Sequence, residues 1–216
     1  MKPLVLVLVL LLLSLPFAAC KDTPRPPITT AWKDDFERAA VGGDYLPTAP
    51  DAYRITGGQM NVSNGYNHPL WLLKKMPRDA VIELDVKSTS PSGDIKIEAW
   101  GDGEHHAPSN EKIQYTSTGY VFIFGGWGNS QSVIARLSEH GSDVAKRTDV
   151  KVVPGKMYHW KIVRKGGHID WFIDDMEKPF LSLDDAQPLQ GDGHAYFAFS
   201  DWESDLWFDN LAIAPL

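Results

Sequence analysis

The stretch Val81-Ile82-Glu83-Leu84-Asp85-Val86-Lys87 alternates strictly between aliphatic and charged side chains. Successive side chains of a β-strand point to opposite faces, so this pattern predicts a strand whose side chains at 82, 84 and 86 face a core. The charged side chains at 83, 85 and 87 are expected on a solvent-exposed face. Such a half-buried strand indicates a sheet that is packed on one side.

The same period continues along the chain in both directions. It recurs at residues 95–100, 158–162 and 169–173, and the last two stretches are joined by Lys165-Gly166-Gly167, which is typical of a hairpin turn. Further strands are expected at residues 59–62, 70–74, 120–124, 133–137, 180–183, 195–200 and 206–213. No window of ten or more residues has an apolar stripe of helical period. The pattern therefore predicts one all-β sandwich domain over residues 32–216.

The charge balance of the chain excludes one class of partner. The 216 residues include 28 acidic and 21 basic ones, which gives a net charge of −7, and the basic residues form no cluster. Nucleic-acid binding depends on neutralising phosphates with Lys and Arg, so no nucleic-acid partner is expected. We expect the protein to be a monomer.

Four segments in a fixed order carry a family resemblance. They are Trp32-Lys33-Asp34-Asp35-Phe36, the strand at 81–88, the hairpin at 158–173 and the closing stretch at 207–213. The chain resembles, over residues 32–214, the concanavalin-A-like lectin/glucanase superfamily, in particular bacterial lipoproteins of that fold. The resemblance implies a jelly roll of two antiparallel sheets, with adjacent first and last strands and a concave face that often holds sugars.

The resemblance makes carbohydrate binding the expected function and leaves two alternatives. Glucanases of this superfamily carry three alternating acids on one strand, but here the third position is Lys87, so that mechanism is rejected. A polysaccharide hydrolase or lyase would need another acid pair in the cleft, such as Glu98 with Glu139 or Asp102. The second alternative is a structural or protein-interaction module whose sandwich face is covered.

The most unusual stretch is Phe124-Gly125-Gly126-Trp127-Gly128-Asn129-Ser130. Its three glycines allow tight turns and the close approach of a ligand to the backbone, and a large ring on such a segment is a poor core residue. We therefore predict a ligand site that includes Trp127, Asn129, Arg136, Glu139 and His140. The alternative is a glycine-rich corner in which Trp127 packs inward and Arg136 pairs with Glu139.

A second candidate lies on the strand at residues 95–100. Glu98, Trp100 and Asp102 alternate on the face opposite the core, where a ring beside carboxylates suits a sugar. The alternative is an exposed strand end that leads into a polar loop. Trp202, between two predicted strands, is expected at the rim of the cleft.

A calcium site is implied by the superfamily resemblance. Related jelly rolls often carry one structural calcium ion on the convex side, and Asp35 and Asp209 would be neighbours if the first and last strands pair. Carboxylate oxygens are the ligands that Ca²⁺ prefers. No other cofactor is expected, because the dispersed histidines lack a zinc-binding spacing.

The first residues predict export and a lipid anchor. Residues 4–15 form a short apolar run, and Phe17-Ala18-Ala19-Cys20 closes it with small residues before the single cysteine. Residues 1–19 are therefore expected to be a signal peptide. The pattern is similar to the lipobox of bacterial lipoproteins, which implies lipidation of Cys20, palmitate included. A proline-rich tether over residues 20–31 would link the domain to an extracytoplasmic membrane surface of the cell envelope, the outer membrane in a Gram-negative cell.

Overall fold

The computed structural model describes residues 25–108, 117–142 and 144–216. The predicted signal peptide (1–19), the predicted lipidation site Cys20 and the first part of the predicted tether lie outside these residues. Within the described part of the chain, no helix has the length and apolar character that crossing a membrane requires.

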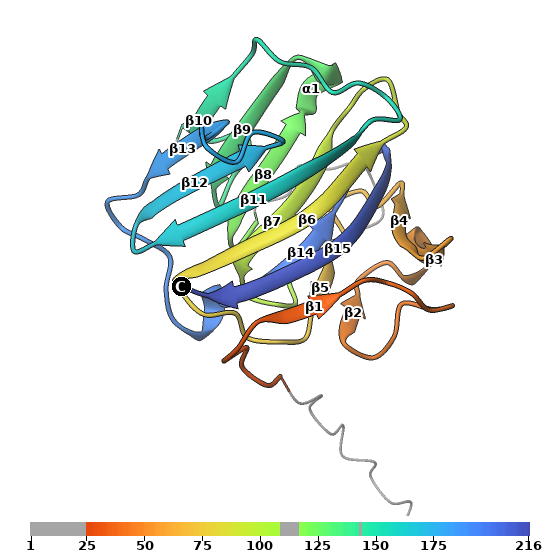
Figure 1. Ribbon diagram of the computed structural model, residues 1–216, viewed down its shortest axis with the longest axis horizontal. Coiled ribbons are helices and arrows are strands. Elements are labelled where there is room, and N and C mark those ends of the chain that lie inside the picture. Colours follow the sequence, from red (N-terminus) through yellow and green to blue (C-terminus); the bar gives the residue numbers. More distant parts are fainter. Residues whose placement is uncertain (1–24, 109–116, 143) are drawn as a thin grey trace, which may run out of the picture.

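The described chain forms two antiparallel sheets that pack face to face (Figure 1). The first sheet has eight strands, in the order β13 (Leu181–Asp184), β12 (His168–Ile173), β11 (Met157–Lys165), β6 (Ala80–Ser88), β15 (Asp205–Pro215), β4 (Gln59–Ser63) and β3 (Tyr53–Thr56), with β1 (Trp32–Asp34) beside β15. The second has seven, in the order β10 (Val144–Arg147), β9 (Gln131–Arg136), β8 (Tyr120–Gly125), β7 (Ile95–Gly101), β14 (Tyr196–Ser200), β5 (Leu70–Leu72) and β2 (Tyr45–Pro47).

Three short helical segments join these strands, and they are η1 (Pro50–Ala52), α1 (Gly126–Asn129) and η2 (Asp192–His194). The prediction of an all-β jelly-roll sandwich is confirmed. The first and last strands pair as the resemblance implied, with Trp32 opposite Ile213. β1 thereby pairs with β15 at residues 211–213, beyond the part of β15 that pairs with β4.

The core lies between the sheets and follows the predicted alternation. In β6, Ile82, Leu84 and Val86 are fully buried, while the charged side chains between them lie on the outer face. Large aromatic rings fill the space between the layers, and the ring centroids of Trp160 and Trp171 lie 4.6 Å apart. Burying such rings is a major source of stability.

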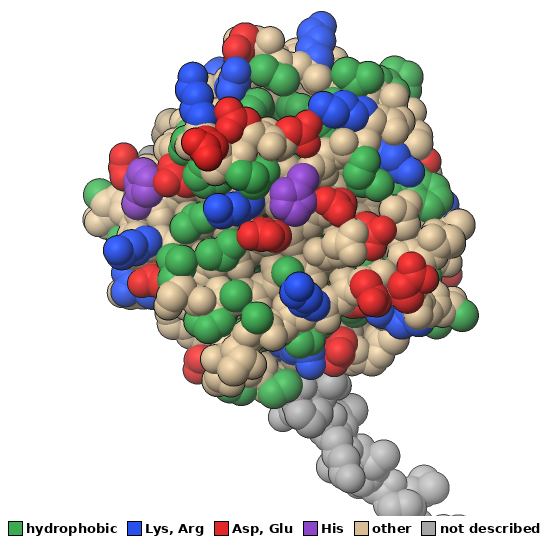
Figure 2. All heavy atoms as spheres, in the orientation of Figure 1, with side chains coloured by type: hydrophobic (Ala, Val, Ile, Leu, Met, Phe, Trp, Pro, Cys, Tyr) green, Lys and Arg blue, Asp and Glu red, His purple; other side chains and the backbone are tan. Residues whose placement is uncertain are grey.

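The outer faces of the two sheets differ. The outer face of the first sheet is solvated, and Figure 2, which views the molecule from this side, shows acidic and basic side chains intermixed. In the second sheet, every residue of β7, β8 and β14 is buried, so both faces of these strands are covered. Polar side chains on the outer face of β7 are therefore enclosed, and this is where the candidate site lies.

Candidate functional site

A pocket of about 550 Å³ opens over the outer face of the second sheet. Its floor includes Lys96 of β7 and Ile123 of β8, two side chains that point away from the core. Loops from five parts of the chain form its walls, and the remaining lining residues are Asn67, Ser92, Asp94, Trp127, Gly128, Glu139, His140, Trp202, Glu203 and Ser204.

The floor of the pocket holds a buried ammonium group. Lys96 is 3 % exposed, and its Nζ donates to Asn67 Oδ1 at 2.7 Å and lies 3.1 Å from Glu139 Oε2. Burial alone would lower the pKa of Lys96, but the charges of Glu139 and Asp94 outweigh it and the pKa is raised. Lys96 is thus held in its charged form by protein groups.

Asp94 borders the same pocket without such a partner. Among the described residues, none donates a hydrogen bond to its carboxylate, although Lys96 attracts it through space. Burial raises the pKa of Asp94, because desolvation penalises the charged form. A ligand with a hydrogen-bond donor can satisfy this group.

Asp201 lies behind the pocket and holds two of its loops. Its carboxylate oxygens accept hydrogen bonds from the backbone N–H groups of Gly65 and Ser204, both at 2.9 Å. Burial raises the pKa of Asp201 to about 7, even though these hydrogen bonds act in the opposite direction. The positions of Asn67 and Ser204 in the lining therefore depend on this buried carboxyl group.

One wall is the glycine-rich segment that carries Trp127. The backbone is left-handed at Gly125, Trp127, Gly128 and Asn129, with φ between 50° and 71°, which turns the chain sharply and presents the indole outward. Trp127 is 39 % exposed. Its ring meets the His140 ring edge-on at 5.7 Å, so this wall is aromatic.

Another part of the rim is formed by Trp202 and the turn at residues 64–68. Tyr66 packs edge-on against the Trp202 ring at 5.8 Å, and its backbone N–H donates to the Trp202 carbonyl at 2.9 Å. Asn64, Tyr66 and Asn67 all have positive φ. Three left-handed non-glycine residues in four positions are costly, and such strain is found where a fold must place side chains for a purpose.

The structure brings together part of the predicted ligand site. Trp127, Glu139 and His140 line one pocket, with His140 Nε2 3.4 Å from Glu139 Oε1. Asn129 supports the wall instead of lining it, because its amide donates to the Val152 carbonyl and accepts from the Val152 N–H, both at 2.8 Å. The alternative in which Trp127 packs inward is wrong.

The placement of Arg136 at the ligand site is corrected. Arg136 lies on the core side of β9 with Ile134, and its Nε lies 3.0 Å from Asp185 Oδ2, outside the pocket lining. The alternative pairing of Arg136 with Glu139 is also wrong, since Glu139 pairs with Lys96. Alternation along the strand places Arg136 and the pocket on opposite faces of the sheet.

The placement of Trp100 at a ligand surface is wrong. The pairing of β7 with β14 skips one residue, with Gly101 opposite Tyr196 and Ala99 opposite Phe197, so Trp100 is the extra residue of a β-bulge. Its φ of 57° turns the ring into the core, where it is fully buried and its Nε1 donates to the Pro77 carbonyl at 3.1 Å. A bulge reverses the face that simple alternation assigns.

Two of the three candidate catalytic acids, Glu98 and Asp102, accept hydrogen bonds from backbone N–H groups of loops. Glu98 is 1 % exposed, and its Oε1 accepts from the N–H groups of Thr118 and Gly119 at 2.8 and 2.7 Å. Asp102 Oδ1 accepts from the N–H groups of Glu104 and His105. Both acids thereby hold loops in place, and only Glu139 of the three lines the main pocket.

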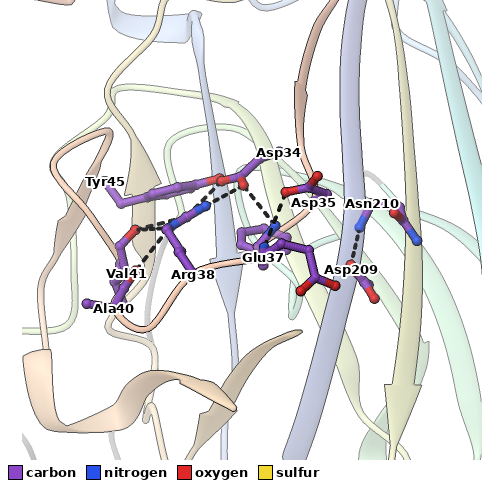
Figure 3. A network of polar contacts seen from close by, with 10 residues as sticks. Asp34, Asp35, Glu37, Arg38, Ala40, Val41, Tyr45, Asp209 and Asn210 are labelled. Atoms are coloured by element: carbon purple, nitrogen blue, oxygen red, sulfur yellow. Dashed lines mark hydrogen bonds and ion pairs between the residues drawn. The ribbon is translucent and has the colours of Figure 1, made fainter. Parts of the chain in front are cut away.

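The predicted calcium ligands lie on the neighbouring segments at β1 and β15 (Figure 3). Asp35 Oδ1 accepts from the Glu37 N–H at 3.2 Å, and Asp209 accepts from Gln59 Nε2 at 3.0 Å. Within the described ranges, no three His, Cys, Asp or Glu side chains are grouped so that they could hold a metal ion. The calcium prediction gains no support from this arrangement.

The acid of this region with the most contacts is Asp34. Its carboxylate binds Arg38 in a two-pronged ion pair and accepts from the Tyr45 hydroxyl at 2.7 Å (Figure 3). Burial acts against ionisation, but the hydrogen bonds from Arg38 and Tyr45 outweigh it, and the pKa of Asp34 is lowered. These contacts are typical of a structural ion pair.

Sequence reasoning missed Lys96, Asp94 and Asn67. A signal for Lys96 was present, because it alternates with Ile95 and Ile97 and shares the outer face with Glu98. What the pattern could not indicate is that this face is covered, since the covering loops come from distant parts of the chain. Asp94 and Asn67 lie in such loops, whose course no local period predicts.

Comparison of the sequence with family models gives one match. The model described as farnesoic acid O-methyl transferase matches residues 77–211. These residues include the pocket floor, the Trp127 segment and most of both sheets. No curated protein sequence matches the chain.

Solved structures share the fold at low identity. A protein of unknown function with a galectin-like fold from Bacillus subtilis is 10 % identical, with a TM-score of 0.61 over 87 % of this chain and 96 % of that one. A structure from work on endo-acting O-glycanases of human gut bacteria that initiate mucin breakdown is 12 % identical, with a TM-score of 0.60 over 87 % and 100 %. The carbohydrate-binding module CBM66 from Bacillus subtilis is 13 % identical, with a TM-score of 0.53 over 88 % and 98 %.

Proposed function

We propose that this chain, which belongs to the family described as farnesoic acid O-methyl transferase, binds carbohydrate in the pocket over Lys96. The observation that carries the proposal is the exposed Trp127 ring beside a floor of charged and amide groups. An aromatic ring covers the apolar C–H face of a sugar, while carboxylate, ammonium and amide groups exchange hydrogen bonds with its hydroxyls.

The solved structures support this class of ligand. They include a carbohydrate-binding module and O-glycanases, which act on glycans. Identities of 12–13 % make this an analogy between folds, and one fold can host many functions. The proposal therefore rests on the pocket residues, and the shared fold agrees with it.

Methyl transfer to farnesoic acid, which the family description names, fits this pocket poorly. An isoprenoid chain needs an extended apolar cavity, whereas here Ile123 shares the floor with the buried ammonium group of Lys96, and Asp94 and Glu139 line the walls. The carboxylate of such a substrate would also meet three acids around a lysine that is already paired. We therefore do not extend that activity to this chain.

Replacing Trp127 by Ala is expected to weaken glycan binding at least tenfold, because stacking on the exposed ring is lost. Affinity electrophoresis and calorimetry with a panel of polysaccharides measure this. Trp207→Ala is the matched control, since Trp207 lies on the outer face of the other sheet, where Lys87 covers its ring. Equal affinity of the Trp127 variant and the wild type, with both folded, would remove the pocket from the proposal.

Cleavage of the glycan is a second candidate, favoured by one observation. Burial raises the pKa of Asp94, which helps a carboxyl group to keep the proton that a general acid must donate, and Glu139 lines the same pocket. The same preparations assayed for new reducing ends distinguish the two candidates. Release that disappears in both Asp94→Asn and Glu139→Gln would favour cleavage over binding alone.

We further propose that the protein is a lipoprotein of the bacterial cell envelope, anchored through Cys20. The support is the apolar run followed by Phe17-Ala18-Ala19-Cys20. Cys20→Ser is expected to move the protein from the membrane fraction to the soluble fraction, because the acyl chains that hold it are lost. Mass spectrometry of the N-terminal peptide checks the modification, and an unmodified Cys20 in the wild type would disprove it.

A further inference from the structure

The pocket has an excess of acidic groups. Among the described residues that line it, Lys96 is the one with a permanent positive charge, whereas Asp94 and Glu139 carry carboxyl groups. Asp201 adds a third carboxyl group directly behind the wall, which is only partly ionised at pH 7 because burial raises its pKa to about 7. Nearby charges set the electrostatic potential inside an open pocket. An excess of carboxyl groups therefore repels an anionic ligand and attracts a cationic one.

The positive charge of Lys96 does not make the pocket attractive to an anionic ligand. Its Nζ already contacts Asn67 Oδ1 and Glu139 Oε2, and the side chain is 3 % exposed. A ligand carboxylate would have to compete with Glu139 for the ammonium group, and would leave Glu139 without its counter-charge in a partly buried site. Among the described lining residues, an anionic sugar therefore meets carboxyl groups and no cation that is free to pair with it.

Asp94 favours a ligand group that donates a hydrogen bond. Its carboxyl group borders the pocket and, within the described ranges, receives no hydrogen bond from the protein. The side chain is half-buried at the edge of an open pocket, so a ligand that donates to it exchanges water for a stronger hydrogen bond in a less polar environment and gains binding energy. Sugar hydroxyls and protonated amines are such donors, and an amine also gains from the aromatic rings of Trp127 and Trp202.

We infer that the pocket takes sugar residues that are amino-substituted or neutral and rejects uronic, sialic and sulfated sugars, with Asp94 accepting a hydrogen bond from the ligand. This inference rests on the proposed carbohydrate-binding function and adds to it the charge class of the ligand. The expected order of affinity is amine-bearing, then neutral, then anionic.

Three probes at pH 7 and 150 mM salt test the order: chitosan oligomers, a neutral β-glucan and a polyuronate. We expect the polyuronate to bind at least tenfold more weakly than the neutral glucan. The net charge of −7 could attract chitosan without a specific site, so variants are needed. Asp94→Asn is expected to reduce the ratio of chitosan affinity to glucan affinity about fivefold or more.

Glu177→Gln is the matched control, because it removes one carboxylate from an exposed position on the chain. It should leave the affinity ratio unchanged. An unchanged ratio in Asp94→Asn, or polyuronate binding as tight as glucan binding, would overturn the inference while the proposed function stands. If the folded protein binds no probe of any charge, the proposed function itself fails, and circular dichroism of each variant confirms that folding is intact.

Discussion

Lys96→Met is expected to lower the free energy of unfolding by about 3 kcal/mol, because it leaves buried acids without their counter-charge. The ammonium group of Lys96 is buried in the pocket floor, and its charge stabilises Glu139 and Asp94 at once. Asn67 Oδ1 also loses the donor that binds it at 2.7 Å. Urea denaturation followed by tryptophan fluorescence measures the change.

The double variant Lys96→Met, Glu139→Gln tests the cause. Removing the uncompensated carboxylate should restore about 1 kcal/mol or more, since the two substitutions act on one ion pair. Lys161→Met is the control, because Lys161 lies on the outer face of the first sheet over the Phe172 ring, and such exposed contacts contribute about 0.5–1 kcal/mol. A loss of less than about 1 kcal/mol in Lys96→Met would show that Lys96 does not neutralise the pocket floor.

The fold could be predicted because its main signal is local. Alternation in residues 81–87 and in the hairpin strands assigns a core face to each residue, and the structure keeps that face in β6, β11 and β12. The short strands β2, β3 and β10 were not predicted. Strands of three or four residues offer too few positions for a period to be seen, and distant partners determine their pairing.

The candidate site could be predicted only in part. The glycine-rich segment indicated Trp127 correctly, because its three glycines have no side chains that could enclose a large ring. Trp100 was misplaced by a single extra residue in β7, and a bulge leaves no mark in an alternating sequence. Lys96, Asn67 and Glu139 lie on three segments that are far apart in the sequence, so no spacing of residues indicates that they meet.

As the pH rises from 5 to 8, the free energy of unfolding is expected to fall by about 2–3 kcal/mol through Asp201. Its pKa is about 7 in the folded protein, against an ordinary value of 3.8, so the folded state holds the proton more tightly. This stabilisation is fully present below the unfolded pKa and is lost as the pH rises through 7, at about 1.4 kcal/mol per pKa unit. The raised pKa of Asp94 acts in the same direction.

The pH dependence of Asp201→Asn provides the test. The variant cannot ionise at this position, so its stability curve between pH 5 and 8 should be flatter than that of the wild type by about 2 kcal/mol. At pH 5 it should be less stable, because an amide nitrogen replaces one of the two oxygens that accept from Gly65 and Ser204. His168, whose pKa is raised chiefly by its hydrogen bond to Asp184, titrates in both proteins and cancels in the comparison. Parallel curves would show that Asp201 is ionised throughout this range, and the two pocket loops would then be held by a charged carboxylate at every pH.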